Sequence, residues 1–442
     1  LEIISRNDST NTLDANGIIV SGISGGGIVT DLRDTSDVLI DLVGLAAYGN
    51  LTVEAIRAQH LTADSMAGQG GLANGVGALA DITDSGSVRV TINDIRHDKV
   101  TSGSASDDDK EAVLAVKAND ATQSYVKAYG AQASALGIGF VEATLNKSGS
   151  TDVVLSGNTF ANDSVNVVAA GGIDSTDESE AMKLTAITEG YGGAVIGSLF
   201  YNQASVNNTH SVNLTVNNGH YADSDSLNLQ ALGHVVYDVR ADAGSGGVLA
   251  MGNNLASVTH AVNVSATLDN LGKAQELTVN AVNSEEATVT SESAGGGVIL
   301  IEGAGNGISP AYTQHTNSAQ TTVTVKGNLQ TQNDLFLGAE TVIDAKFKAD
   351  NTQGGVAGGS GANLVNNNTT VTKVIFDKGS TVTAGGKLTA NALTTSQLSS
   401  AEGYYAVDSG VYGGFMGSEI RLQNTENNTN EVLFSDGASA QS

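Results

Sequence analysis

The chain has 442 residues, 20 Lys and Arg against 47 Asp and Glu, a formal net charge of −27, and no Cys. The acidic balance argues against nucleic acid and anionic membranes as partners, because phosphate binding needs a basic surface. The lack of Cys excludes disulfides, zinc fingers and thiol catalysis.

A short phrase, made of a small residue, two glycines and an aliphatic residue, recurs along the whole chain. A spacing of roughly 55 residues, kept from end to end, indicates a repeat architecture. The chain contains 54 Gly and one Pro, which suits a continuous stack of paired strands because Pro removes ladder hydrogen bonds. The phrases lie around Gly26, Gly71, Gly137, Gly193, Gly247, Gly297, Gly355 and Gly414.

Two alternating apolar segments follow the glycine phrase, in a constant order, in all seven complete repeats. Apolar residues at every second position predict strands with one face inward. The first segment has a Val-x-Val pattern and lies at 38–40, 88–92, 153–155, 212–216, 262–264, 323–325 and 374–376. The second ends in Ala and lies at 51–55, 113–118, 165–169, 227–231, 277–281, 335–339 and 388–392.

These segments predict an all-β fold, a right-handed parallel β-helix (β-solenoid). A repeat of this length holds about four strand-length segments, so we expect roughly two rungs per repeat. About 16 rungs at ~4.8 Å would make a body about 75 Å long. Continuous repetition predicts that residues 1–442 form a single elongated segment, and the sequence ends suggest a piece of a longer chain. We expect Gly247→Val and Gly296→Val to destabilise it by a few kcal/mol.

Carboxylate pairs of the kind used by β-helix enzymes that cleave polysaccharides occur in three polar loops. They are Asp174 with Asp177, Asp223 with Asp225, and the run from Asp107 to Asp109. None has an adjacent Arg or aromatic platform, and catalytic carboxylates need neighbours that push their pKa values apart. We therefore expect no enzyme and no catalytic residue, and keep a polysaccharide lyase or hydrolase as the alternative.

No residue is expected to bind a metal or a cofactor. Residues 358–366 imitate the calcium-binding nonapeptide of toxin β-rolls, but Asn363 stands where Asp is expected and the motif occurs once. We predict a structural turn there, and no change in melting temperature with excess chelator. The histidines have no metal-ligand spacing and are expected to be ordinary polar residues: His60, His97, His210, His220, His234, His260 and His315.

The glycine phrases, combined with Thr-Val-Thr-Val-x-Gly-Asn-Leu at residues 322–329, resemble the leukotoxin-type and filamentous-haemagglutinin-like giant adhesins of Gram-negative bacteria. The resemblance covers essentially the whole chain and rests on composition and period. It implies a secreted or surface-anchored right-handed parallel β-helix that serves as an adhesive fibre. It transfers no catalytic residue to this sequence.

We expect a structural and adhesive stalk, located outside the cell or on the bacterial surface. Loops such as 102–111 and 171–181 would contact a host or bacterial receptor, either protein or glycan. Lateral or end-to-end self-association is a further expectation. Besides the enzyme, a segment of a secreted leukotoxin stays open as an alternative, although no amphipathic inserting element is evident.

Overall fold

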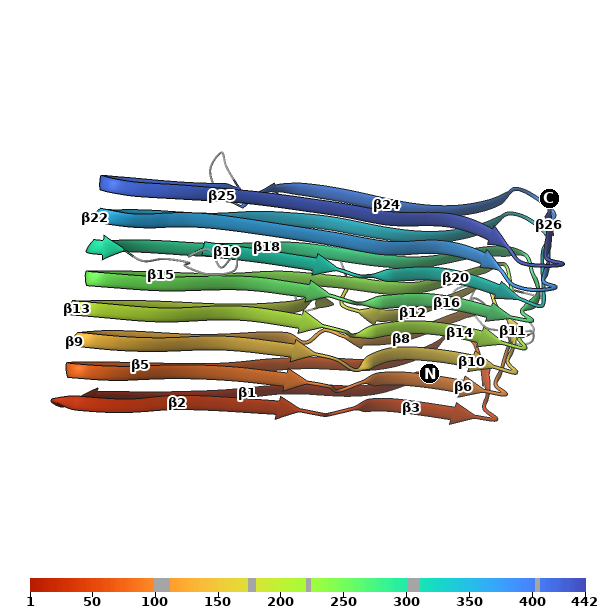
Figure 1. The fold of residues 1–442 in the computed structure, drawn as a ribbon. Helices are drawn as coiled ribbons and strands as arrows, with labels where there is room; N and C mark the ends of the chain where they lie inside the picture. Colours follow the sequence, from red (N-terminus) through yellow and green to blue (C-terminus); the bar gives the residue numbers. More distant parts are fainter. Residues whose placement is uncertain (99–111, 174–179, 220–223, 301–310, 402–405) are drawn as a thin grey trace.

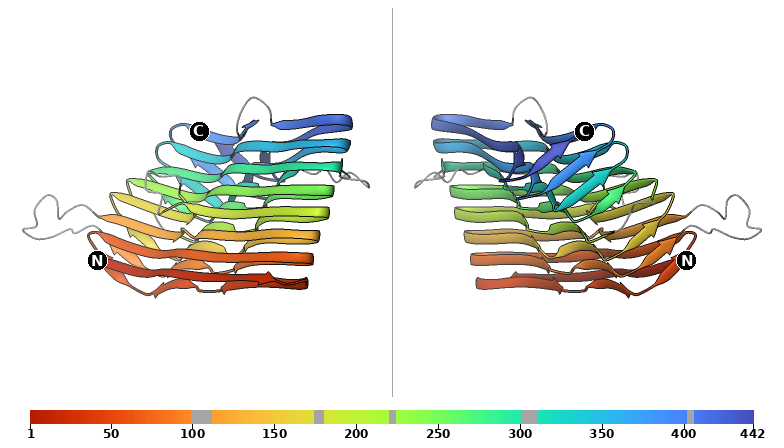
Figure 2. Two further views of the ribbon diagram at one scale, coloured as in Figure 1. Left: turned by 90° about the vertical axis from the view of Figure 1, so that its left-hand side faces the viewer. Right: turned by 90° about the vertical axis from the view of Figure 1, so that its right-hand side faces the viewer.

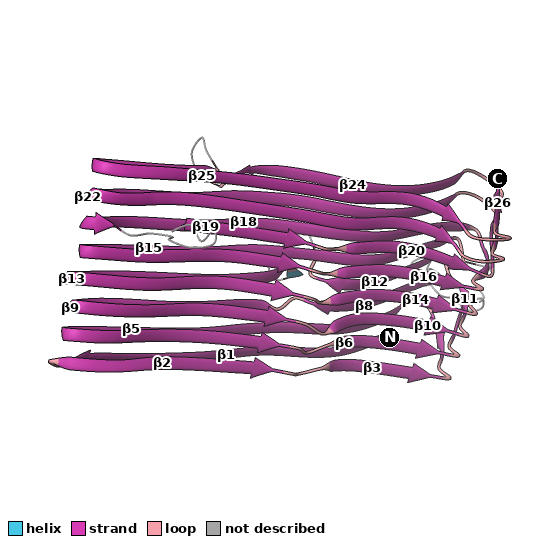
Figure 3. Cartoon of the chain, viewed as in Figure 1, coloured by secondary structure: helices cyan, strands magenta, loops and turns pink. Residues whose placement is uncertain are grey.

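The computed structural model describes residues 1–98, 112–173, 180–219, 224–300, 311–401 and 406–442. Strands make up most of the described chain, which confirms the all-β prediction (Figure 3). No helix in these ranges is both long and apolar enough to cross a membrane. Within the described residues, the strands form sheets of 19, three and four strands.

The chain builds layers that lie on top of one another from the N-terminus to the C-terminus (Figure 1). The first layer contains β1 Glu2–Val20, β2 Ile23–Asp34, β3 Val38–Val43 and β4 Ala46–Tyr48, and the second contains β5 Leu51–Asp84, β6 Val88–Asn93 and β7 Arg96–Asp98. The third contains β8 Val113–Asp120, β9 Gln123–Lys147, β10 Ser150–Ser156 and β11 Thr159–Ala161, and the fourth contains β12 Ser164–Gly171, β13 Met182–Asn208 and β14 Ser211–Asn217. The fifth layer contains β15 Ser226–His260, β16 Asn263–Asp269 and β17 Gly272–Ala274, and the sixth contains β18 Glu276–Leu300, β19 Ala311–Asn317, β20 Gln320–Lys326 and β21 Asn328–Thr331. The seventh contains β22 Leu335–Phe376 and β23 Thr381–Ala384, and the eighth contains β24 Leu388–Ser400, β25 Val407–Phe434 and β26 Ser439–Gln441.

The two apolar segments predicted from the sequence form columns that run through the layers. Neighbouring strands pair in parallel, so that equivalent residues of successive repeats lie side by side. The Val-x-Val segments supply one column: Ile40, Val90, Val153, Leu214, Ala266, Val323, Val374 and Val432. The Ala-ending segments supply another: Leu51, Leu114, Val165, Leu227, Leu277, Leu335 and Leu388. Except in the end layers these side chains are buried, and they form much of the core.

The prediction of two rungs per repeat is wrong, because each repeat forms one layer. Leu51 pairs with Leu114 and Leu114 pairs with Val165, so partners lie a whole repeat apart. Eight layers, separated by seven intervals of ~4.8 Å, give a height of about 34 Å, about half the predicted length. The extra residues lengthen the strands instead: β5 alone spans 34 residues. The stack is therefore broad and low (Figure 2).

The glycine phrases lie where each layer turns back on itself, on the side of the stack that is farther from the two chain termini (Figure 1). The pairing ladder is interrupted at these turns, by one residue at Leu72 between Gly71 and Ala73 and by more between Gly193 and Gly197. Gly71 has φ +154°, and an added Cβ would lie 1.7 Å from the carbonyl oxygen of Ser21 in the layer below. The turn therefore requires glycine at this position, because no side chain fits between the layers.

The structure predicts different losses of stability for Gly247→Val and Gly296→Val, whereas the sequence predicts the same loss for both. A Cβ on Gly247 would lie 2.5 Å from the carbonyl oxygen of Ala194, whereas the nearest atom to a Cβ on Gly296 is 3.8 Å away. We now expect Gly247→Val to lose about 2–4 kcal/mol in urea unfolding, and Gly296→Val to stay within ~1 kcal/mol of the parent. Equal losses in the two variants would contradict this account of the turn.

Candidate functional site: an apolar edge and two buried polar clusters

The turns of the inner layers line up along one side of the stack and form its edge. They lie at residues 70–73, 133–136, 193–197, 246–249, 296–299 and 354–357. We call the charge-free segments that contain these turns the apolar edge: residues 65–80, 128–141, 190–204, 243–258, 293–300 and 351–371. The alternation of inward and outward side chains breaks at each turn, so that an aliphatic residue points outward at the tip.

Large apolar side chains are exposed along the apolar edge. In layers two to seven, which have a neighbour on both sides, Leu72 is 69% exposed and Val195 73%. Among the described side chains of these layers, every exposed large apolar residue except Tyr125 belongs to the edge. The others are Met66, Leu136, Ile138, Phe140, Tyr191, Ile196, Leu199, Val248, Leu249, Val298 and Val356. A contiguous exposed apolar surface of this kind marks an interaction site.

The apolar edge carries no charged residue, although the chain has 47 acidic and 20 basic residues. Electrostatic repulsion between acidic chains falls off over about 8–10 Å at physiological salt, so a charge-free surface of this width can approach another surface closely. The charge-free stretches of layers two to seven are 65–80, 128–141, 190–204, 243–258, 293–300 and 351–371.

A column of charged side chains borders the apolar edge on one face. Glu189, Asp242, Glu292 and Asp350 pair in register, one in each layer. Basic neighbours partly neutralise them: Lys127 Nζ lies 2.9 Å from Glu189, and Lys348 Nζ lies 2.8 Å from Glu292. Burial raises the pKa of Asp242 and Asp350. The boundary between charged face and apolar edge is therefore sharp.

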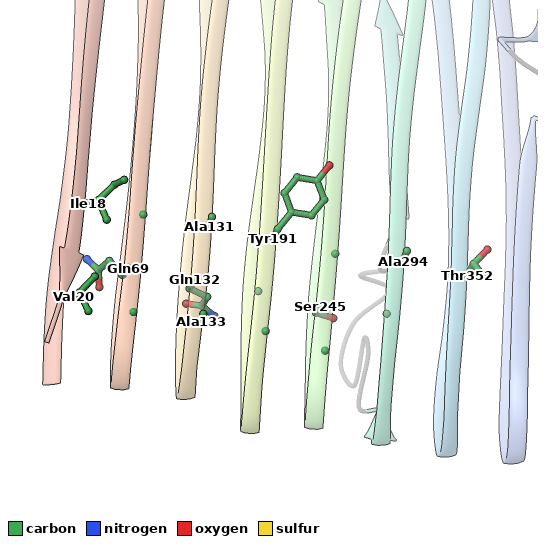
Figure 4. Close-up of a pocket in the computed structure, with 17 residues that line it drawn as sticks. Ile18, Val20, Gln69, Ala131, Gln132, Ala133, Tyr191, Ser245, Ala294 and Thr352 are labelled. Atoms are coloured by element: carbon green, nitrogen blue, oxygen red, sulfur yellow. The ribbon is translucent and has the colours of Figure 1, made fainter. Parts of the chain in front are cut away.

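Small residues make the apolar edge a ridge between two grooves. On one face, glycine and alanine backbones line a groove of about 850 Å³ that crosses seven layers, from Ile18 past Tyr191 to Thr352 (Figure 4). On the other face, a groove of about 660 Å³ is lined by Ile23, Leu136 and residues of three further layers. Both grooves follow the stack, at right angles to the strands.

A cluster of charges is buried inside layers two and three. Arg57 Nη2 donates to Asp84 Oδ1 at 2.6 Å, and Lys147 Nζ lies 2.7 Å from Asp84 and 2.6 Å from Asp120. All four side chains have no exposed surface. Burial by itself would raise the pKa of Asp120, but the charges of Lys147 and Arg57 outweigh burial and hold it far below its usual range. These carboxylates are fully ion-paired and cannot meet a substrate.

A second buried polar cluster lies higher in the stack, around Glu285. Its carboxylate accepts hydrogen bonds from His315 Nε2 at 2.7 Å and Asn317 Nδ2 at 2.5 Å. Burial would raise the pKa of Glu285, but His315 and His260 outweigh it and lower the pKa to about 2. The same ion pair raises the pKa of His315. Burial lowers the pKa of His260, which lies 2.8 Å from the Tyr237 hydroxyl.

Several histidines of the described chain are buried in hydrogen-bond networks. Burial and the Lys147 charge lower the pKa of His210 to about 4. His97 Nε2 lies 2.6 Å from the Gly49 carbonyl oxygen. No group of three or more potential ligands in the described ranges could hold a metal ion.

Most of the other candidate residues and loops singled out in the sequence lie outside the described residues. Asp107 to Asp109, Asp174, Asp177, Asp223 and His220 lie outside the described residues, as do 102–111 in full and 174–179 of the second loop. Asp225 accepts a hydrogen bond from Gln275 Nε2 at 2.9 Å. The prediction of a turn at residues 358–366 is wrong, because the segment lies within β22 and Asn363 is buried in its strand.

Sequence reasoning missed the buried charges, although the alternating pattern contains a signal for them. Arg57 follows the inward Ala55 by two residues, Asp84 follows Ile82, and Lys147 follows Leu145. A period of two therefore places all three charges on the inward face. No model of a known protein family matches the chain, and neither a curated protein nor a solved structure matches it.

Proposed function

We propose that residues 1–442 form a right-handed parallel β-helix that acts as a structural and adhesive stalk segment of a giant secreted or surface-anchored bacterial adhesin. In this proposal the chain works outside the cell, as a stiff scaffold that repeats one contact surface in every layer. The receptor-binding loops expected from the sequence stay part of the proposal, with the apolar edge added as a contact surface.

The parallel pairing of successive repeats supports the β-helix. Each layer returns to the same register one repeat later, as with Leu227 beside Leu277 and Leu277 beside Leu335. Connections between parallel strands of one sheet are right-handed in about 98% of cases, which favours the right-handed form. In such a stack each layer contacts its neighbours only, so length can grow without a larger core.

The repeated apolar edge is the observation that best supports adhesion. An exposed ridge from Leu72 to Val356 serves no purpose in packing within the chain, since the core lies inside the layers. Exposed aliphatic residues lower solubility, so their repetition over six inner layers indicates a function that compensates for this. Equivalent contacts side by side add avidity, because the second contact forms at a high effective concentration.

Attachment of cells that display this chain tests the proposal. Residues 1–442 would be displayed on a non-adherent bacterium, as parent and as an edge variant that combines Leu72→Ser, Val195→Thr, Val248→Thr, Val298→Thr and Val356→Thr. We expect the parent to promote attachment to epithelial cell layers or clumping of the bacteria, and the edge variant to lose at least 80–90% of the effect, as multivalent binding falls steeply when contacts are removed.

The control is a variant with polar substitutions at exposed apolar residues away from the edge, Leu39→Ser and Val43→Thr in the first layer and Leu393→Ser in the last. This control also removes exposed apolar surface, so non-specific hydrophobic adhesion would fall in both variants. Full adhesion of the edge variant would refute a role for the edge. No adhesion of the parent, at equal surface display, would refute the proposed function.

A further inference from the structure

We propose that the partner bound by the apolar edge is a second copy of this chain, so that two stacks join edge to edge as a symmetric dimer. The inference rests on the proposed adhesive role and names the partner of the same surface. It would make the contact between cells homophilic. Three features of the edge support it: its shape, its charge and its size.

The shape of the edge is self-complementary. The ridge presents one aliphatic tip per layer, among them Leu72, Val248 and Val298, and the groove beside it is lined by glycine and alanine from the same layers. The tips therefore repeat at one spacing, about 4.8 Å, beside a continuous groove that follows the same layers. Two copies related by a twofold axis can each place a ridge in the partner's groove, which makes a closed interface with the same residues on both sides.

The distribution of charge favours a second copy at this surface. Two chains of net charge −27 repel each other, and a basic partner would instead seek the acidic faces. Along the edge no carboxylate enters the contact, and the nearest acidic column, Glu189 to Asp350, carries its own Lys and Arg neighbours. An anionic bilayer would be repelled in the same way without offering matching hollows.

The size of the edge fits a reversible dimer. The six layers of the edge, five intervals of ~4.8 Å, give a contact about 24 Å long, and a width of about 15 Å gives roughly 360 Å² from each copy. The total of about 700 Å² is in the range of weak, transient contacts. We therefore expect monomers and dimers to exchange, with association that depends on protein concentration.

Sedimentation equilibrium of purified residues 1–442 tests the dimer. The parent should show a monomer–dimer equilibrium, the five-residue edge variant should dissociate at least tenfold more readily, and the off-edge control should match the parent. Raising NaCl from 0.05 to 0.5 M should tighten the dimer, because screening weakens repulsion and no ion pair holds the contact. A dimer that weakens as salt rises would overturn the inference. So would a dimer that persists in the edge variant, because stacks that associate end to end do not need the edge.

A cysteine reporter locates the contact, since the chain has no Cys of its own. Val195 lies in the fourth of eight layers, so it would lie near the twofold axis whether the two stacks are parallel or antiparallel. Val195→Cys should form a disulfide-linked dimer on mild oxidation, because bridged Cα atoms must come within about 7 Å. Asn207→Cys, exposed in the same strand β13 but away from the edge, should stay monomeric. Equal cross-linking of the two positions overturns the proposed geometry.

The experiments can refute the dimer without refuting the adhesive function, and the adhesive function without refuting the dimer. Attachment to epithelial cells that depends on the edge, by a chain that stays monomeric at all concentrations, would keep the function and refute the second copy as partner. A dimer with the expected salt dependence, in a chain that confers neither attachment nor clumping, would keep the dimer and refute adhesion.

Discussion

Deleting residues 247–296 should leave a folded β-rich protein that is shorter by one layer. The deletion joins Gly246 to Gly297, and Gly247 pairs with Gly297 in the parent, so each strand stays in register with its new neighbour. The stack has mainly nearest-neighbour contacts, so the loss of one layer removes its own interfaces and leaves the others in place. Circular dichroism should stay β-rich, and small-angle scattering should show a body about 5 Å lower.

Deleting residues 265–314, which removes the same number of residues, should prevent folding. His315 pairs with Val258, so joining Val264 to His315 sets the chain back by seven positions in the layer. An odd shift sends every inward side chain outward, and the broken strand edge then favours aggregation. Equal collapse of both deletion variants would contradict the layered stack, and equal folding of both would show that register does not limit it.

Replacing Lys147 by Met should destabilise the protein by about 3–5 kcal/mol. The substitution keeps the length of the side chain but removes the charge that lies 2.7 Å from Asp84 and 2.6 Å from Asp120. Arg57 is then the single cation left inside the cluster, against two buried carboxylates and the partly buried Asp34. Uncompensated charge in the interior is the physical reason for so large a loss. Urea unfolding at pH 7, followed by circular dichroism, measures it.

Lys346→Met is the matched control. Its side chain is 48% exposed and its ammonium lies 3.9 Å from Asp344, so it should change the free energy of unfolding by at most ~0.5–1 kcal/mol. A loss below ~1 kcal/mol for Lys147→Met would mean that water reaches the cluster or that Arg57 alone neutralises it.

Alternation and repetition were readable in the sequence because both depend on local chemistry. The Val-x-Val and Ala-ending segments predicted the strands and their order, and the columns confirm that equivalent segments lie side by side. The predicted number of layers was wrong because period-2 alternation shows on which face of a strand a residue lies. It does not show how many residues the chain runs before it turns. Only the tertiary structure shows that β5 continues through a turn at Gly71.

The candidate site illustrates the same division. The sequence by itself determined that Leu72, Val195 and Val298 follow glycine phrases and that no charge lies near them. It could not show that these residues are exposed, since an aliphatic residue in an alternating strand is usually buried. Tertiary structure decided this. Where two long faces converge at a turn, the interior holds glycine, alanine and polar side chains such as Gln69, Gln132 and Gln353, and the large apolar side chains at the tip point outward to solvent or to a partner.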